Sequence, residues 1–182
     1  LNQCTLTGNR ANYGGGIYNK FGATLTVNQS TLSENTGEFG ASDLFNGGTL
    51  TLFNSIVTDS LQGGLSGGGS LTLLGNNLTT GDPMLAGLGN YGGPTPTMPP
   101  VSGSPALNAG DDSSAGTFAT DQRGGLRWSG SHPEIGSVEV PFVSGQPAHL
   151  TGLTRLGNGA VQFSFSNVAN ASFTALASTN LA

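Results

Sequence analysis

The chain has 182 residues, of which only 8% are charged, and it carries 31 glycines and a formal net charge of −5 at pH 7. An ordinary globular domain has about 25% charged residues, so Ser, Thr and Asn must supply most of the polar surface. The chain contains five Lys and Arg residues, too few for a phosphate-binding face, which argues against nucleic acid or anionic membrane as a partner. No stretch approaches the ~18 apolar residues that a membrane span needs.

A repeated unit organises the first third of the chain. Its complete copy spans residues 13–35, YGGGIYNKFGATLTVNQSTLSEN, and it returns over residues 39–60. Within each copy the apolar residues alternate with Thr, Asn and Ser, which is the periodicity of β-strands. Equivalent positions lie 25 or 26 residues apart, or 21 for a shorter last copy, and the matched pairs are Tyr13 with Phe39, Leu6 with Leu32, Leu25 with Leu50, Val27 with Leu52, Leu32 with Val57, and Leu50 with Leu71.

A repeat of this length indicates a solenoid. One unit cannot bury its apolar face alone, whereas stacked units place Leu over Leu at a spacing of about 4.8 Å and pair through parallel backbone hydrogen bonds. We therefore predict an all-β fold in which residues 1–80 form a single-stranded parallel β-helix of about three to four coils. Asn9 and Asn35 occupy the same turn in successive copies, so we expect their amides to hydrogen-bond along the stack.

Two local features of the repeats have structural interpretations. Cys4 stands where Ser30 and Ser55 stand in later copies. We interpret it as a small inward-facing residue, because a single thiol without a matching base does not indicate a nucleophile. The run GGLSGGG at residues 63–69 is expected to form a loose turn or protruding loop before the last coil.

The remainder of the chain divides into two parts. Residues 81–141, called the closing segment below, are rich in Pro and Gly and hold most of the charge. Residues 142–182 read as the start of a sandwich-like antiparallel β module, with the GNG sequence at residues 157–159 as a hairpin turn. Leu1 falls inside a strand pattern and Ala182 follows one, so we expect this chain to be part of a longer protein.

The closing segment contains a series of short motifs in a fixed order. They are Asp82-Pro83 with Leu85 and Leu88, Asn90, Gly92-Gly93-Pro94-Thr95, Gly103-Ser104-Pro105-Ala106, Ala109-Gly110, Asp121-Gln122-Arg123-Gly124, Arg127, and Ile135-Gly136 with Glu139. This series resembles the closing segment of the choice-of-anchor Q family of bacterial surface and secreted proteins. The upstream GGGIYN and TLTVNQSTLSEN units look like the β-helix repeats of that family and of polymorphic outer-membrane proteins. Asn108, Glu134 and Ser137 depart from its usual Asp, Asp and Ala.

The resemblance implies a right-handed β-helix whose open end is covered by the closing segment. Such a cover is physically favourable, because an exposed end would leave strand backbone groups unpaired and would promote aggregation. The resemblance also implies an extracellular or cell-surface location for a secreted bacterial protein.

Glu34 and Asp59 form the first group of residues with chemical potential. They occupy equivalent positions in adjacent copies, so stacking would bring their carboxylates to on the order of 5 Å from each other. That separation suits a retaining glycosidase, and the pair could also serve a calcium ion. We favour two solvated acidic residues at a turn, because the repeat places no basic or aromatic partner beside them.

The closing segment supplies the other candidates. Its charged group consists of Asp121, Arg123, Arg127, Glu134 and Glu139. An enzyme could use such a group on an acidic sugar, but we favour a structural ion-pair network that ties irregular loops together. Asp111 and Asp112 could bind calcium, although a charged loop tip is the preferred interpretation.

Two histidines and two aromatic residues are further candidates for a site. His132 and His149 have no Ser or Cys suited to a triad and read as surface residues. Tyr91 and Trp128 could stack on sugar rings, but we favour rings that pack the closing segment against the last coil or lie half exposed. We therefore assign no catalytic, cofactor-binding or metal-binding residue and expect no cofactor.

Two functions fit these observations. The leading one is a non-catalytic extracellular or cell-surface β-helical protein, acting as a stalk or adhesin-like module that contacts glycans or other surfaces. The alternative is a polysaccharide lyase or glycoside hydrolase whose catalytic groups lie partly outside this chain. An enzyme would need carboxylates and bases on one strand face, whereas charged residues are scattered through the coils, among them Arg10, Lys20, Glu34, Asp43 and Asp59.

Overall fold

The computed structural model describes residues 1–40, 43–58, 68–114, 117–140, 149–155 and 161–166. The chain divides into two compact units, Leu1–Pro141 and Phe142–Ala182. The described residues form short β-strands and a single turn of 3-10 helix, Asp112–Ser114. The prediction of an all-β protein with parallel strands is confirmed. Within the described residues no helix has the length and apolar character that a membrane span requires.

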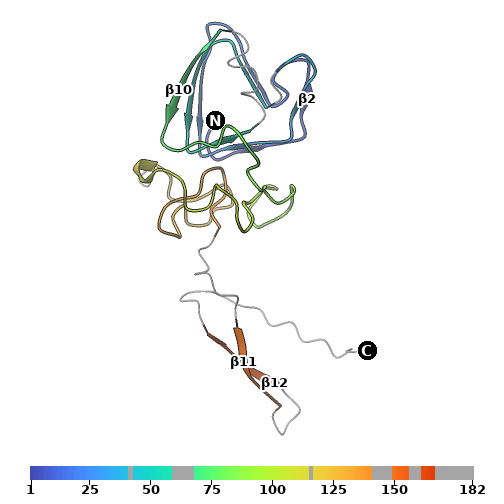
Figure 1. Ribbon diagram of the computed structural model, residues 1–182, viewed down its shortest axis with the longest axis vertical. Coiled ribbons are helices and arrows are strands. Elements are labelled where there is room, and N and C mark those ends of the chain that lie inside the picture. The colour runs from blue at the N-terminus through green and yellow to red at the C-terminus, as the bar shows by residue number, and fades with distance from the viewer. Residues whose placement is uncertain (41–42, 59–67, 115–116, 141–148, 156–160, 167–182) are drawn as a thin grey trace. The chain divides into compact units, whose positions relative to one another are not determined.

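The strands of the first unit pair with their counterparts in the next repeat, and every one of these pairings is parallel. They form four sheets, with the orders β1-β5-β9, β10-β8-β4, β2-β6 and β3-β7 (Figure 1). The bounds are β1 (Thr5–Leu6), β2 (Arg10–Ala11), β3 (Ile17–Asn19), β4 (Thr24–Asn28), β5 (Thr31–Leu32), β6 (Thr36–Gly37), β7 (Leu44–Asn46), β8 (Thr49–Phe53), β9 (Ile56–Val57) and β10 (Ser70–Leu74).

The register of these pairings is the one that the repeat predicts. The confirmed partners are Leu6 with Leu32, Leu25 with Leu50, Val27 with Leu52, Leu32 with Val57, and Leu50 with Leu71. A shift by one residue would send every apolar side chain to the opposite face of its strand, so burial of one face fixes the register.

The apolar interior of the repeats is one cluster between the sheets. Its buried members are Val27, Leu32, Leu44, Leu50, Leu52 and Val57. Burying a side chain of this size stabilises the folded state by about 1.5–3 kcal/mol relative to leaving it in water. Each repeat contributes only a few such residues, so neighbouring repeats depend on one another for stability.

Asparagine side chains connect the repeats at their turns. The predicted pair is confirmed, because Asn9 Nδ2 donates to Asn35 Oδ1 at 2.9 Å. A second pair joins the buried side chains of Asn19 and Asn46, whose amide atoms lie 2.6 Å apart. Such stacked amides satisfy polar groups that would otherwise be unpaired inside the turns.

A column of left-handed residues forms another corner, where the chain leaves the β4–β8–β10 sheet. Gln3, Gln29 and Asn54 occupy this corner in successive repeats, with φ angles of 48°, 44° and 44°. Gly75 takes the same role in the last repeat, with φ of 58°. This conformation is unusual for residues other than glycine, and its recurrence turns the chain in the same way in each repeat.

The closing segment packs on the outer face of the β1–β5–β9 sheet. Alternate residues of a strand point to opposite faces, so Leu32 faces the interior while Thr31 and Ile56 face outward. Ile56 forms a second apolar cluster with Ala106 and Ile135 of the closing segment. The backbone N–H of Ser137 donates to Thr31 Oγ1 at 3.1 Å.

These contacts lie along a side of the stacked repeats, whereas the sequence led us to expect a cover over an end. Figure 1 shows the closing segment running beneath the sheet. The backbone N–H of Gly136 donates to the carbonyl of Asn54 at 2.8 Å, and a Cβ at Gly136 would lie 2.9 Å from Cδ1 of Ile56. Because φ of Gly136 is also +106°, a conformation that side-chain-bearing residues rarely adopt, glycine suits this close approach.

The second unit contains an antiparallel pair, as expected for this part of the chain. Its strands are β11 (His149–Arg155) and β12 (Val161–Ser166), with a register shift between Thr151 and Thr154. The predicted hairpin turn at residues 157–159 lies outside the described residues. The same holds for most of the predicted glycine loop, of which only Gly68 and Gly69 are described.

Candidate functional site

The closing segment brings its five predicted charged residues together. Four of them are almost inaccessible to solvent: Asp121 is 3% exposed, Arg127 2%, Glu134 1% and Glu139 2%. The fifth, Arg123, bridges to Asp121 with its guanidinium 2.9 Å from the carboxylate. Charged side chains are rarely buried to this degree unless they are paired, so their mutual contacts decide what the group can do.

Asp121 organises the loop that carries Arg123. Its carboxylate accepts hydrogen bonds from the backbone N–H groups of Arg123 at 2.8 Å, Gly125 at 3.1 Å and Glu139 at 3.0 Å. Arg123 in turn donates to the backbone carbonyl of Glu139. Hydrogen bonds to a carboxylate are stronger than those between neutral groups. One side chain therefore holds two separate stretches of irregular backbone.

Glu139 and Arg127 fasten the next loop. The Glu139 carboxylate accepts from the backbone N–H groups of Ser129 and Glu134, both at 3.1 Å. Arg127 donates through Nη2 to the backbone carbonyl of Glu134 at 2.6 Å. These bonds satisfy backbone groups that no strand ladder can serve, because this part of the chain is not in a sheet.

Glu134 differs from the other carboxyl groups of the cluster. Burial, together with the hydrogen bond to and the charge of the Glu139 carboxyl, raises the pKa of Glu134 to about 9. Its Oε2 atom has no hydrogen-bond partner among the described residues, which also disfavours the ionised form. Burial lowers the pKa of the Arg127 guanidinium, but an arginine stays charged at neutral pH.

The charges of the cluster cancel when Glu134 is protonated. The two arginines then balance the carboxylates of Asp121 and Glu139, and the Glu134 carboxyl can donate its proton to Glu139. Ionising Glu134 would add an unbalanced negative charge to a desolvated site. The side chains of the cluster are buried, and they hydrogen-bond to the backbone of the loops that carry them. This geometry suits a structural role in holding the loops together, and a polysaccharide could not reach the charged groups.

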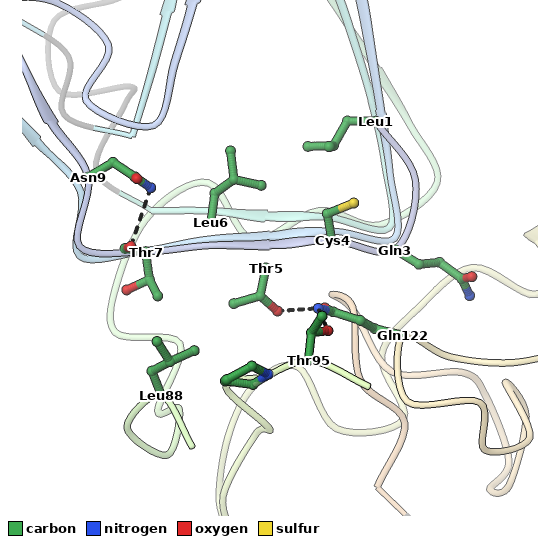
Figure 2. Close-up of a pocket in the computed structure, with 11 residues that line it drawn as sticks. Leu1, Gln3, Cys4, Thr5, Leu6, Thr7, Asn9, Leu88, Thr95 and Gln122 are labelled. Atoms are coloured by element: carbon green, nitrogen blue, oxygen red, sulfur yellow. Dashed lines mark hydrogen bonds between the residues drawn. The ribbon is translucent and has the colours of Figure 1, made fainter. Parts of the chain in front are cut away.

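A hollow of about 620 Å³ lies between the first repeat and the closing segment. Figure 2 shows Leu1, Cys4 and Leu6 on the inner side of the chain, with Thr5 on the outer side facing the closing segment. Its lining contains no charged side chain; the residues are Leu1, Gln3, Cys4, Thr5, Leu6, Thr7, Asn9, Leu88, Thr95, Pro96 and Gln122.

Gln122 of the closing segment links the first repeat, through Thr5, to a second residue of the closing segment, Thr95. Thr5 Oγ1 donates to Gln122 Oε1 at 2.7 Å, and Gln122 Nε2 donates to Thr95 Oγ1 at 3.1 Å (Figure 2). Cys4 lies on the inner side as expected, and its backbone N–H donates to Ser30 Oγ at 3.2 Å. The hydroxyl and amide groups suit an uncharged polar ligand, although they are largely engaged with one another.

The remaining predicted candidates stand apart from this hollow. Glu34 is exposed at a turn with φ of 60°, and Asp59 lies outside the described residues. Asp112 pairs with His132, both about half exposed, at 2.9 Å. The hydrogen bonds that Ser113 donates lower the pKa of Asp111. Within the described ranges no group of three His, Cys, Asp or Glu residues is placed to hold a metal ion.

The two predicted sugar-stacking rings of the closing segment make local contacts. Trp128 Nε1 donates to the carbonyl of Gly130 at 3.0 Å, and the Tyr91 hydroxyl donates to the carbonyl of Gly87 at 3.0 Å. Each ring is about 40% exposed. The side chain of His149 lies outside what the structure describes.

Sequence reasoning did not find an aromatic cluster on the outer surface of the repeats, which we call the ring platform. Its members are Tyr13, Tyr18, Phe39 and Phe45. Tyr18 stacks on Phe45 with ring centroids 4.9 Å apart, and Tyr13 contacts Phe45 at 5.6 Å and Phe39 at 5.9 Å. The 26-residue match of Tyr13 with Phe39 pointed toward it, but Tyr18 and Phe45 are 27 residues apart and escaped that pattern.

Comparisons of the chain with protein-family models, with curated proteins and with solved structures found no match.

Proposed function

We propose that residues 1–80 form a right-handed parallel β-helix of about three to four coils, fastened by the closing segment. In this proposal the chain is a non-catalytic part of an extracellular or cell-surface protein and acts as a stalk or adhesin-like module that contacts glycans. The observation that carries it is the register of the parallel strands. Strands of successive repeats pair position by position in four sheets, as a rigid solenoid requires.

The motifs of the closing segment support the proposed location. Their order resembles the choice-of-anchor Q family of bacterial surface and secreted proteins, and the same resemblance supports the right-handed solenoid. The composition agrees, because a stalk outside the cell needs a hydrated surface and this chain supplies it with Ser, Thr and Asn while only 8% of its residues are charged.

The positions of the charged side chains support the proposal that the chain is not a catalyst. The dense charged cluster is buried in its own loops, and Asp43 of the coils is fully buried as well. Arg10 and Glu38 are exposed and pair with each other at 2.9 Å. A lyase or hydrolase needs an accessible acid and base facing one substrate position, and the described residues offer no such arrangement.

The test uses the purified chain and a panel of neutral and acidic polysaccharides. Retention on insoluble polysaccharide measures binding, and the release of new reducing or unsaturated sugar ends measures cleavage. We expect binding of at least one polysaccharide with no release of ends. Cleavage of any member, or failure to bind every member, would overturn the proposal. Labelling of an epitope tag on intact cells tests the surface location separately.

A further inference from the structure

The ring platform joins aromatic residues of two successive repeats. Tyr18 lies in β3 and Phe45 in the paired strand β7, with an angle of 11° between their ring planes. Tyr13 precedes β3 and meets Phe45 edge-on at 63°, and Phe39 follows β6 beside Tyr13. Two of the three tyrosines of the chain are thus gathered at one place.

The exposure of these rings exceeds what stacking of the repeats requires. Phe39 is 65% exposed, Tyr18 56% and Tyr13 44%. Cross-strand aromatic pairs stabilise a sheet by about 0.2–1 kcal/mol each. This stabilisation comes from the ring surfaces in contact and does not explain why so much of each ring remains exposed. Tyr18 meets Phe45 with one face while more than half of its surface stays open, so its other face is available to a ligand. Grouped exposed apolar side chains of this kind mark interaction sites.

The charged residues close to the platform in sequence, and the net charge of the chain, indicate which class of ligand the platform would bind. Glu38, which precedes Phe39 in the chain, forms an exposed ion pair with Arg10 at 2.9 Å, so the two side chains offer a hydrogen-bond donor and an acceptor but no net charge. The chain as a whole carries a net charge of −5, which repels polyanions over the range that salt does not screen. The complement of this surface is therefore an uncharged ligand with apolar ring faces and many hydroxyl groups.

We propose that the ring platform is the binding site for a neutral oligosaccharide. A sugar ring stacks on the open face of Tyr18 and on Phe39. Its hydroxyl groups exchange hydrogen bonds with the tyrosine hydroxyls and with the Arg10–Glu38 pair. This inference rests on the proposed glycan-contacting function and gives it a location on residues that do not line the hollow.

The experiment is calorimetric titration of the intact chain with hexasaccharides of neutral sugars, β-linked glucose, mannose and xylose, and with a hexasaccharide of uronic acids. The variants Tyr18→Ser and Phe39→Ser remove platform rings. Leu88→Ser is the matched control, because it removes an exposed apolar side chain, 53% exposed, from the hollow. Tyr18→Phe keeps the ring, and melting temperatures establish that each variant is folded.

We expect at least one neutral hexasaccharide to bind. Each ring deletion should weaken this binding roughly tenfold, equivalent to about 1.4 kcal/mol. Leu88→Ser should bind as the unmodified chain does, and Tyr18→Phe should retain most of the affinity.

Five results would overturn the inference. Binding that survives both ring deletions, or that Leu88→Ser abolishes, would place the glycan elsewhere while leaving the proposed function intact. Tighter binding of the uronic acid hexasaccharide would contradict the neutral ligand class. Failure to bind any polysaccharide or oligosaccharide would remove the proposed function as well. Self-association that the ring deletions abolish, without sugar binding, would identify a second copy of the chain as the occupant.

Discussion

Replacing Glu134 by glutamine tests whether the closing segment is locked by a buried protonated carboxyl. The pKa of Glu134 is about 9 in the folded chain, against an ordinary value of 4.5. Above pH 4.5 the unfolded chain releases this proton while the folded chain keeps it. The folded state then binds more protons than the unfolded state, so the contribution of Glu134 to stability falls as the pH rises. It is fully present below about pH 4.5 and is lost by about pH 9.

The size of the effect follows from the same pKa difference. Between the two pKa values the loss is about 1.4 kcal/mol per pH unit, or about 4 kcal/mol between pH 5 and pH 8. Glu134→Gln has nearly the same shape and can still donate to Glu139, but it does not ionise. The free energy of unfolding of the variant should therefore rise relative to the unmodified chain by about that amount across this range.

The assay is urea unfolding at pH 5, 6, 7 and 8, followed by fluorescence. The chain has one tryptophan, Trp128, which lies in the closing segment next to Ser129, a donor to Glu139, so the signal reports on the locked loops. Glu34→Gln removes an exposed carboxyl outside the cluster and is the control for a Glu-to-Gln change as such. Parallel pH profiles for the unmodified chain and Glu134→Gln would refute the buried protonated carboxyl.

Three further tests, which use four substitutions, concern the packing. Gly136→Ala should cost about 1–3 kcal/mol in the free energy of unfolding, because φ is +106° and the new Cβ would meet Ile56; unchanged urea midpoints would contradict the close approach. Leu50→Ala should cost about 2–5 kcal/mol and Leu73→Ala, at a side chain 51% exposed, far less; equal losses would contradict the assigned interior. Asn46→Ala should cost about 1–3 kcal/mol and speed amide hydrogen exchange at the repeat turns, and unchanged exchange rates would argue against the amide stack.

The parallel strand pairs that the structure describes within residues 1–80 could be predicted from the sequence because they repeat. Alternation of apolar and polar residues fixed the strand faces, and the spacing of 25 or 26 residues fixed which positions pair, as Leu25 with Leu50 and Leu32 with Val57 show. The Asn9–Asn35 contact followed from the same spacing. Each of these inferences needs only local periodicity and the requirement that the apolar face be buried.

Other features depend on contacts between unlike segments and could be decided only by the tertiary structure. The sequence grouped Glu134 with Glu139, but its raised pKa requires burial and a carboxyl neighbour, and neither has a periodic signal. The closing segment lies along the β1–β5–β9 sheet because Ile56 is the apolar member of an outward-facing column that needs cover. The ring platform was missed because Phe45 follows Tyr18 by 27 residues, outside the period of 25 or 26, and only the folded chain brings its ring against Tyr18.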